Sequence, residues 1–182
     1  ENYEIVAKES RGRKVLDLFC HNGGFALRSA KAGASEVTGV DSSRPSLELA
    51  RQSAEHHGLK VRWAQEDVTR FLRTCRKREY DLLILDPPGL VKSRESAEAG
   101  TKLMAELHRS SMKVLARGGL LATFSCSHRV GSEELLGMVK QVAKEEGRVV
   151  QIKTALGQSS DHPMDPAFPE SRYLSGFLLV VI

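Results

Sequence analysis

Short apolar runs alternate with amphipathic stretches along almost the whole chain. In the stretch 133–146, apolar residues at 135, 136, 139, 142 and 143 recur at the spacing of a helix face. The apolar runs are shorter and are bounded by turn residues, which is typical of strands. The predicted strands are 14–19, 36–40, 61–64, 81–85, 119–124, 149–153 and 173–181. The predicted helices are 24–32, 44–57, 69–76, 100–115 and 133–146.

This alternation of strands and helices indicates βαβ units, whose right-handed crossovers place helices on both faces of a parallel sheet. A polar, proline-rich loop, 157–172, joins the last two strands without a helix, so we expect them to pair antiparallel. The sequence therefore predicts an α/β fold with a Rossmann-like, seven-stranded, mostly parallel sheet and an antiparallel C-terminal strand. We also expect the polar stretch 89–99 to form a mobile loop over the cleft.

Composition narrows the class of protein without naming a function. A length of 182 residues fits one domain, and 41% hydrophobic residues can build a core. We find no apolar window of about twenty residues for a membrane span and no signal peptide. Three cysteines without disulfide or metal-ligand spacing predict a reducing, cytoplasmic setting and no metal. The net charge of +4 allows a polyanionic partner, but a solvated basic surface explains it equally well.

Glycines and carboxylates follow the first three predicted strands. The first strand runs into DLFCHNGGF, where Gly23 and Gly24 allow a tight turn into a helix. Asp41 ends the second strand, about twenty residues after the glycines, where an acid can bind ribose hydroxyls. Asp67 follows the third strand, although either aspartate could instead cap the next helix. Together these strand ends predict a nucleoside cofactor site, without the G-x-G-x-x-G spacing of a pyrophosphate cradle.

A carboxylate and a thiol end the next two strands along the chain. The fourth strand is followed by Asp86-Pro87-Pro88 and the fifth by Cys126, and both open at one edge of a parallel sheet. A free cysteine at a strand end is more often a small buried residue. The flanking serines and the nearby carboxylate favour a nucleophile instead. Pro87 and Pro88 stiffen the loop and could shape a slot for a flipped base.

The segments DLFCHNGGF, GVDSS, EDV and DPP together resemble class I S-adenosylmethionine-dependent methyltransferases. The longer pattern of DPPGLVKSR, TFSCS and DHPMDPAFPESRYLSGF resembles the bacterial large-subunit ribosomal RNA 5-methylcytosine methyltransferases. This resemblance runs from about Lys14 to the end of the chain. It implies that residues 1–182 are a catalytic domain whose partner is RNA, expected to be ribosomal. Because the chain starts at Glu1 rather than Met, we expect a longer protein with an N-terminal RNA-binding module.

The resemblance also assigns cofactor contacts. It implies that the glycine turn lies under the methionine part of S-adenosylmethionine, that Asp41 holds the ribose, and that Asp67 and Val68 face the adenine. The complete set of implied contacts is Asp17, Phe19, Cys20, His21, Asn22, Gly23, Gly24, Asp41, Ser42, Asp67, Val68 and Asp86. The chain departs from the family at His21, where an aromatic residue is usual, and at 103–105, which is usually more polar.

Carbon-5 of cytosine is too weak a nucleophile to take a methyl group unaided. In the resembled mechanism a thiolate, here that of Cys126, adds to carbon-6 and activates carbon-5. Asp86 is the expected acid at ring nitrogen-3. A thiolate needs a lowered pKa, for which we expect positive charge from Lys92, His128 or Arg129.

Further residues are expected at the substrate. Pro87, Pro88, Lys92 and His162, the last from the segment DHP, are the predicted substrate contacts. Lys92, Arg94 and Lys102 are candidates for phosphate contacts, although a solvated surface explains them equally well.

Two other functions remain open at this point. Methylation of a base amino group uses a DPP segment without cysteine, but normally with an aromatic residue where this chain has Gly89. A non-catalytic module that binds S-adenosylmethionine or RNA could share the same fold, because fold does not fix function. The sequence does not distinguish a monomer from a homodimer.

Overall fold

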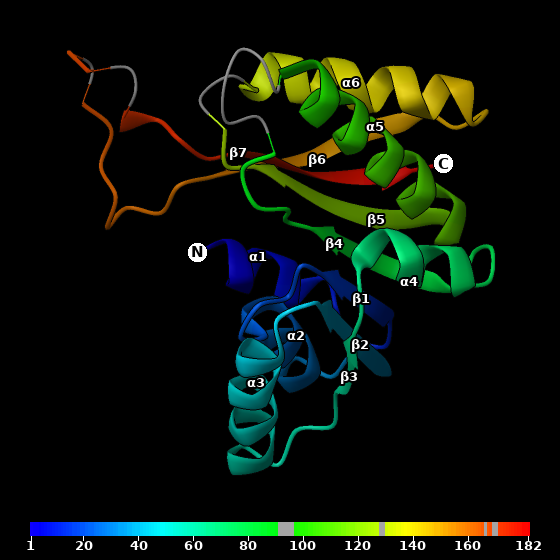
Figure 1. Ribbon diagram of the computed structural model, residues 1–182, viewed down its shortest axis with the longest axis vertical. Helices are drawn as coiled ribbons and strands as arrows, with labels where there is room; N and C mark the ends of the chain where they lie inside the picture. Colours follow the sequence, from blue (N-terminus) through cyan, green and yellow to red (C-terminus); the bar gives the residue numbers. More distant parts are fainter. Residues whose placement is uncertain (91–96, 128–129, 166, 169–170) are drawn as a thin grey trace.

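The computed structural model describes residues 1–90, 97–127, 130–165, 167–168 and 171–182. The strands in these ranges form a seven-stranded sheet in the order β3-β2-β1-β4-β5-β7-β6 (Figure 1). The strands are β1 (Lys14–Leu18), β2 (Glu36–Asp41), β3 (Arg62–Gln65), β4 (Tyr80–Leu85), β5 (Leu115–Ser125), β6 (Val150–Gly157) and β7 (Ser175–Val181). The helices are α1 (Asn2–Lys8), α2 (Gly24–Lys31), α3 (Arg44–His56), α4 (Val68–Thr74), α5 (Ala97–Val114) and α6 (Ser132–Glu145).

The predicted sheet is confirmed. Strands β1 to β5 pair in parallel, and β7 lies between β5 and β6, antiparallel to both. From β1 the chain builds outward through β2 and β3, and from β4 it builds in the opposite direction. The order therefore reverses between β1 and β4, and in open α/β sheets ligands bind beyond the strand ends at such a reversal.

Side chains that alternate along the strands divide the core into two layers. Leu83 and Leu121 pack with residues of α4, α5 and α6 on one face of the sheet. Leu82 and Ile84 pack with Val6 of α1 and with α2 on the other face. The central strands are apolar on both faces because helices cover both. No helix in the described part of the chain is long and apolar enough to span a membrane.

Several boundaries differ from the prediction, and β6, for example, extends to Gly157 rather than to 153. Helix α1 was not predicted, because only Val6 and Ala7 of its residues are buried and no helical stripe emerges. Helix α5 begins at Ala97, so the end of the expected loop 89–99 is helical, while 91–96 lie outside the described residues. Strand β5 begins at Leu115 rather than at 119, because the exposed Arg117 and Gly118 interrupt its apolar run.

Arg148, in the connection between α6 and β6, links the elements at the edge of the sheet where β5 begins and β7 ends. All three of its guanidinium nitrogens donate hydrogen bonds to backbone carbonyls, at 2.9 to 3.3 Å. The acceptors are the carbonyls of Met112, Leu115, Ala116, Val181 and Ile182. One side chain thus ties the end of α5, the start of β5 and the end of β7 together.

Candidate active site

The turn between β1 and α2 has a strained backbone. Phe19 and His21 have φ angles of 60° and 48°, in the left-handed region that side chains other than glycine rarely adopt. Gly23 follows with φ 82°, where glycine carries no such strain. Strain of this kind persists only where the surroundings hold it, and it gathers at functional sites. These angles leave no mark in the sequence, which pointed to the turn only through its glycines.

Asp41, at the end of β2, is one of the groups that hold this turn. Its Oδ2 accepts the N–H of His21 at 2.8 Å, and its Oδ1 accepts the N–H of Ser43 at 2.8 Å. Ser43, rather than Asp41, caps α3, because its side chain accepts the N–H of Ser46. Both carboxylate oxygens of Asp41 are therefore fixed in direction, with the exposed Ser42 beside them.

Asp67 and Val68 lie where β3 passes into α4. Asp67 caps that helix, and its Oδ1 accepts the N–H of Arg70 at 2.9 Å, as the capping alternative predicted. The side chain of Val68 is 3% exposed and packs in the core with Phe71. A ligand at this strand end would therefore meet the backbone of Val68 rather than its side chain.

Two aromatic rings close against the glycines, and neither was predicted as part of the site. A Cβ atom on Gly23 or on Gly39 would lie 2.5 Å from the ring of Trp63. A Cβ atom on Gly24 would lie 2.7 Å from Cζ of Tyr3 and 2.9 Å from its hydroxyl. The turn thus packs against Trp63 from β3 and against Tyr3 from α1, so side chains are excluded at these positions.

The carboxylates of Asp41 and Asp86, at the ends of β2 and β4, act on Asp17 near the end of β1. Asp17 is buried; its Oδ2 accepts the N–H of Ala26 at 2.9 Å, and its Oδ1 has no hydrogen-bond partner among the described residues. Burial raises the pKa of Asp17 to about 8, and the charges of Asp86 and Asp41 contribute to the rise. An unpaired buried oxygen beside two further carboxylates suits a cationic ligand, because a positive charge would offset this repulsion. S-adenosylmethionine, with its sulfonium and ammonium groups, fits such a site.

Asp86 and Cys126 lie side by side because β4 and β5 are parallel neighbours, with Leu85 opposite Thr123. The Cys126 thiol points to Oδ1 of Asp86 at 4.0 Å, a long hydrogen bond in which sulfur is the donor. Burial raises the pKa of Asp86 to about 6. Partial burial raises the pKa of Cys126 to about 11, and the charge of Asp86 contributes. The expected pairing of thiol and carboxylate is therefore present.

In the described surroundings the pKa of Cys126 is raised, because the thiol is partly buried and has a carboxylate as its neighbour. The proposed sources of positive charge, Lys92, His128 and Arg129, lie outside the described residues, as does Arg94. Lys102 lies on α5, in the groove between α5 and α6 rather than beside Asp86.

A cavity of about 180 Å³ adjoins Asp86. His162, a predicted substrate contact, lines it, and its ring lies edge-on to that of Tyr173 with centroids 6.1 Å apart. Pro87 is buried next to Asp86, while Pro88 is exposed. The cavity is lined by Glu1, Asn2, Tyr3, Phe25, Asp86, Phe124, Gln158, Ser159, His162, Tyr173 and Leu174. The residues from α1 carry no motif that the sequence analysis could have found.

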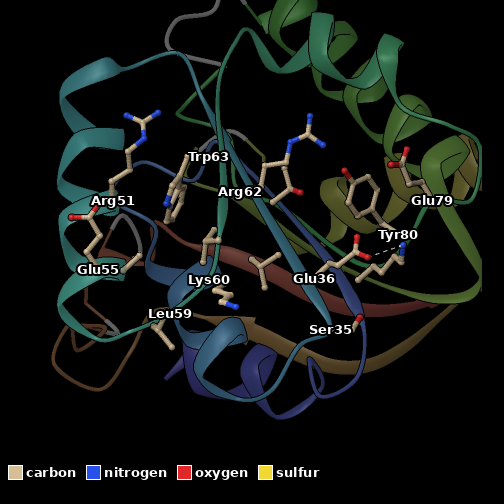
Figure 2. A pocket seen from close by; sticks show the side chains of 15 residues that line it. Ser35, Glu36, Arg51, Glu55, Leu59, Lys60, Arg62, Trp63, Glu79 and Tyr80 are labelled. Carbon is tan, nitrogen blue, oxygen red and sulfur yellow. Dashed lines mark ion pairs between the residues drawn. The ribbon is translucent and has the colours of Figure 1, made fainter.

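A second cavity, of about 640 Å³, opens at the opposite edge of the sheet, where β1, β2 and β4 begin (Figure 2). Arg51, Arg62 and Glu79 give it a mixed charge, and Lys14 forms an ion pair with a neighbouring glutamate at 3.1 Å. None of the predicted site residues that the structure describes lines this cavity. Trp63, which packs against the glycine turn, forms part of its wall.

Residues 4–151 match the family described as methyltransferase small domain. The protein named ribosomal RNA large subunit methyltransferase I is 35% identical in Aeromonas hydrophila, over 98% of this chain and 46% of that protein. Its Photobacterium profundum counterpart is 36% identical, over 100% of this chain and 47% of that protein. The chain thus spans about half the length of the curated relatives it matches.

Two solved structures share the fold. A proposed methyltransferase in complex with SAH gives a TM-score of 0.84 at 19% identity, covering 98% of this chain and 48% of that one. A proposed SAM-dependent methyltransferase from Streptococcus mutans gives a TM-score of 0.81 at 19% identity, covering 98% of this chain and 47% of that one. At this identity the likeness shows the fold alone.

Proposed function

The chain belongs to the methyltransferase small domain family, and from this premise we propose that it methylates carbon-5 of a cytosine in RNA. The methyl donor is S-adenosylmethionine, and the reaction proceeds through a covalent adduct to Cys126. The names of the curated relatives support RNA, and ribosomal RNA in particular, as the substrate. The observation that carries the reaction type is the contact between the Cys126 thiol and Asp86.

When bound, S-adenosylmethionine supplies an electrophilic methyl group on a positively charged sulfur. In the proposal Asp41, whose carboxylate is fixed by two backbone N–H groups, accepts hydrogen bonds from the ribose. Asp17 and Asp86 offset the positive charge, and the strained turn 19–23 backs the methionine part of the cofactor. Asp67 lies at the strand end where the adenine would be placed.

The chemistry begins with transfer of the Cys126 proton to Asp86. The thiolate forms a bond from sulfur to carbon-6 of cytosine, and nitrogen-3 takes a proton from Asp86. A pKa of about 6 suits Asp86 to both transfers, because proton exchange is most efficient near the working pH. Carbon-5, now part of an enamine, takes the methyl group. A base then takes the carbon-5 proton, the double bond between carbon-5 and carbon-6 forms again, and the electrons of the sulfur–carbon-6 bond return to Cys126. Nitrogen-3 gives its proton back to Asp86, which returns it to the thiolate.

The first test is mass spectrometry of the nucleosides in undermethylated bacterial ribosomal RNA after incubation with the protein and S-adenosylmethionine. We expect new 5-methylcytosine from the parent protein and none from Cys126→Ala, because the adduct cannot form. Cys75→Ala is the matched control and should methylate at the parental rate. The dissociation constant for the cofactor should be unchanged in both variants.

An RNA that carries 5-fluorocytosine sharpens this test, because fluorine cannot leave carbon-5 as a proton does. The parent should accumulate a complex with this RNA that survives denaturation, and Cys126→Ala should not. Parental activity in Cys126→Ala would overturn the adduct. A methylated amino group as the product would favour the alternative chemistry at Asp86-Pro87-Pro88.

A further inference from the structure

The cavity beside Asp86 is built by two segments that lie far apart in the sequence and are fastened to each other. Asn2 donates a hydrogen bond from its side chain to the carbonyl of Gly157 at 2.8 Å. The hydroxyl of Ser160 donates to the carboxylate of Glu1 at 2.7 Å. The start of α1 and the loop between β6 and β7 therefore form two connected walls around one hollow.

Aromatic rings make up much of these walls. The rings of Tyr3 and Phe25 meet edge to face at 4.5 Å, and Phe25 lies 5.4 Å from Phe124. Tyr173 and His162 form a second pair in the loop between β6 and β7. Tyr3 and Tyr173 remain 45% and 37% exposed, so their rings are available to a ligand. Aromatic side chains of this kind are the surfaces on which nucleic-acid bases stack.

The size of the cavity restricts what can enter. Its volume of about 180 Å³ lies below the roughly 300–1,000 Å³ typical of sites for whole small molecules. A single planar ring is a suitable occupant, whereas a complete nucleoside cofactor is too large. A ring held here would lie beside Asp86, whose Oδ1 is 4.0 Å from the Cys126 sulfur.

Tyr3 stands between this cavity and the glycine turn. Its ring lies against Gly24, where a Cβ atom would come within 2.7 Å, and it also lines the cavity. Its hydroxyl makes no hydrogen bond within the part of the chain that the structure describes, so it is available to a ligand. Because Tyr3 borders both the proposed cofactor turn and the cavity, it is placed to orient a base toward the methyl donor.

We propose that this cavity is the pocket for the target nucleobase and that Tyr3 and Tyr173 determine its preference for a base. This inference rests on the proposed function, because it assigns a pocket to that reaction. The competing assignment is that Tyr3 contacts only the cofactor, and the experiment below separates the two.

The test is a binding measurement on the protein saturated with S-adenosylhomocysteine. The ligands are a short single-stranded RNA with one cytosine and the same RNA with an abasic position there. We expect the parent to bind the cytosine RNA about tenfold more tightly, as stacking of one base on an aromatic ring predicts. Tyr3→Ala and Tyr173→Ala should each lose most of this ratio, and Tyr3→Phe should keep it within a few-fold.

Leu49→Ala, which truncates an exposed apolar residue on α3, is the matched control and should retain the parental ratio. Two outcomes would overturn the pocket. One is a parent that does not distinguish the two RNAs. The other is a parental ratio in folded Tyr3→Ala and Tyr173→Ala, whether or not the dissociation constant for S-adenosylhomocysteine rises. Failure of the proposed function would be seen separately. If the parent prefers the cytosine RNA but forms no 5-methylcytosine, the base pocket is supported and the proposed methylation reaction is refuted.

Discussion

At the scale of single residues, Cys126 is a protonated thiol beside an ionised Asp86, so it is not yet the thiolate that the proposed reaction needs. With pKa values of about 11 for the thiol and about 6 for the carboxyl, sulfur keeps its proton near neutral pH and Asp86 is mostly ionised. A thiol reacts through its thiolate, so the free protein should show little reactivity at Cys126. We infer that nucleophile formation depends on ligands that change the charge around this pair.

The substitution Asp86→Asn separates the two roles of the carboxylate. Loss of its negative charge lowers the pKa of Cys126, so alkylation of Cys126 by iodoacetamide at pH 8 should become several-fold faster. Methyl transfer should fall, because Asn cannot exchange the proton. The measurement is the alkylation rate of each cysteine by mass spectrometry between pH 7 and 11.

Cys75 is an internal control for this experiment. Burial and the charge of Glu79 raise its pKa to about 11, and Asp86 does not contribute. Its alkylation should be the same in the parent and in Asp86→Asn. An unchanged pH profile at Cys126 would contradict the electrostatic coupling.

The sequence identified the candidate residues that directly follow apolar strands. It missed the features that only tertiary contacts create. Asp41, Asp86 and Cys126 could be placed at one edge because apolar runs mark the strands that carry them. The backbone angles of Phe19 and His21 are imposed by tertiary contacts, so no local pattern reveals them. In the described surroundings, burial and the charge of Asp86 raise the pKa of the Cys126 thiol, and the residues from which a lowering was expected lie outside the described residues.

At the scale of elements, His108 joins α5 to β5, the strand that leads to Cys126, the proposed nucleophile. Its Nδ1 lies 2.7 Å from the carbonyl of Met104 and must be the protonated nitrogen, so Nε2 accepts the hydroxyl of Thr123 at 2.8 Å. Burial lowers the pKa of His108 to about 4, which keeps the ring neutral. Thr123 lies three residues before Cys126, so this contact ties α5 to the strand segment that leads to the thiol.

Thr123→Val removes this hydroxyl and leaves Nε2 of His108 buried without a partner. The free energy of unfolding should fall by about 1–3 kcal/mol. The double variant with His108→Leu should lose less than the sum of the two single variants, because no polar atom is then left unpaired. Urea denaturation of all four proteins gives the coupling energy, and strict additivity would refute the contact.

His108 should also make stability depend on pH. Its folded pKa of about 4 lies below the ordinary value of 6.5, so the unfolded chain binds more protons between these values. Stability should therefore decline as pH falls from about 6.5 to about 4, and this part of the slope should be absent in His108→Leu. Asp17, whose raised pKa gives a slope of opposite sign, is present in both proteins and cancels in the comparison.

Element prediction failed where burial is slight. The helices α2 to α6 each bury a stripe, which the periodicity of the sequence displays, whereas α1 buries only Val6 and Ala7. Missing α1 meant missing Tyr3, which lines the cavity proposed as the base pocket.

At the scale of the whole molecule, the order of the strands followed from their alternation with helices, since right-handed crossovers leave few arrangements. The hydrogen bonds by which Arg148 joins α5, β5 and β7 could not be predicted from the sequence. Their acceptors are backbone carbonyls from three separate elements, which no side-chain pattern encodes.

Arg148→Lys tests these hydrogen bonds. Lysine carries one donor group in place of a planar fork, so most of the five acceptors lose their partner. The free energy of unfolding should fall by about 2–4 kcal/mol, since several hydrogen bonds from a charged group to partly buried carbonyls are lost. Arg73→Lys, on the exposed side of α4, is the matched control and should change it by less than about 0.5 kcal/mol. If both variants had the same urea midpoint of unfolding, Arg148 would not be stabilising the fold in this way.

Trp63 gives the molecule an optical property. It is the single tryptophan of the chain, and its indole packs against Gly23 and Gly39 while it also lines the cavity at the opposite edge (Figure 2). The ultraviolet emission of this protein under selective excitation therefore comes from one position, in contact with the turn where the methyl donor is proposed to bind. A change in the colour or intensity of that emission reports on the turn without any attached dye.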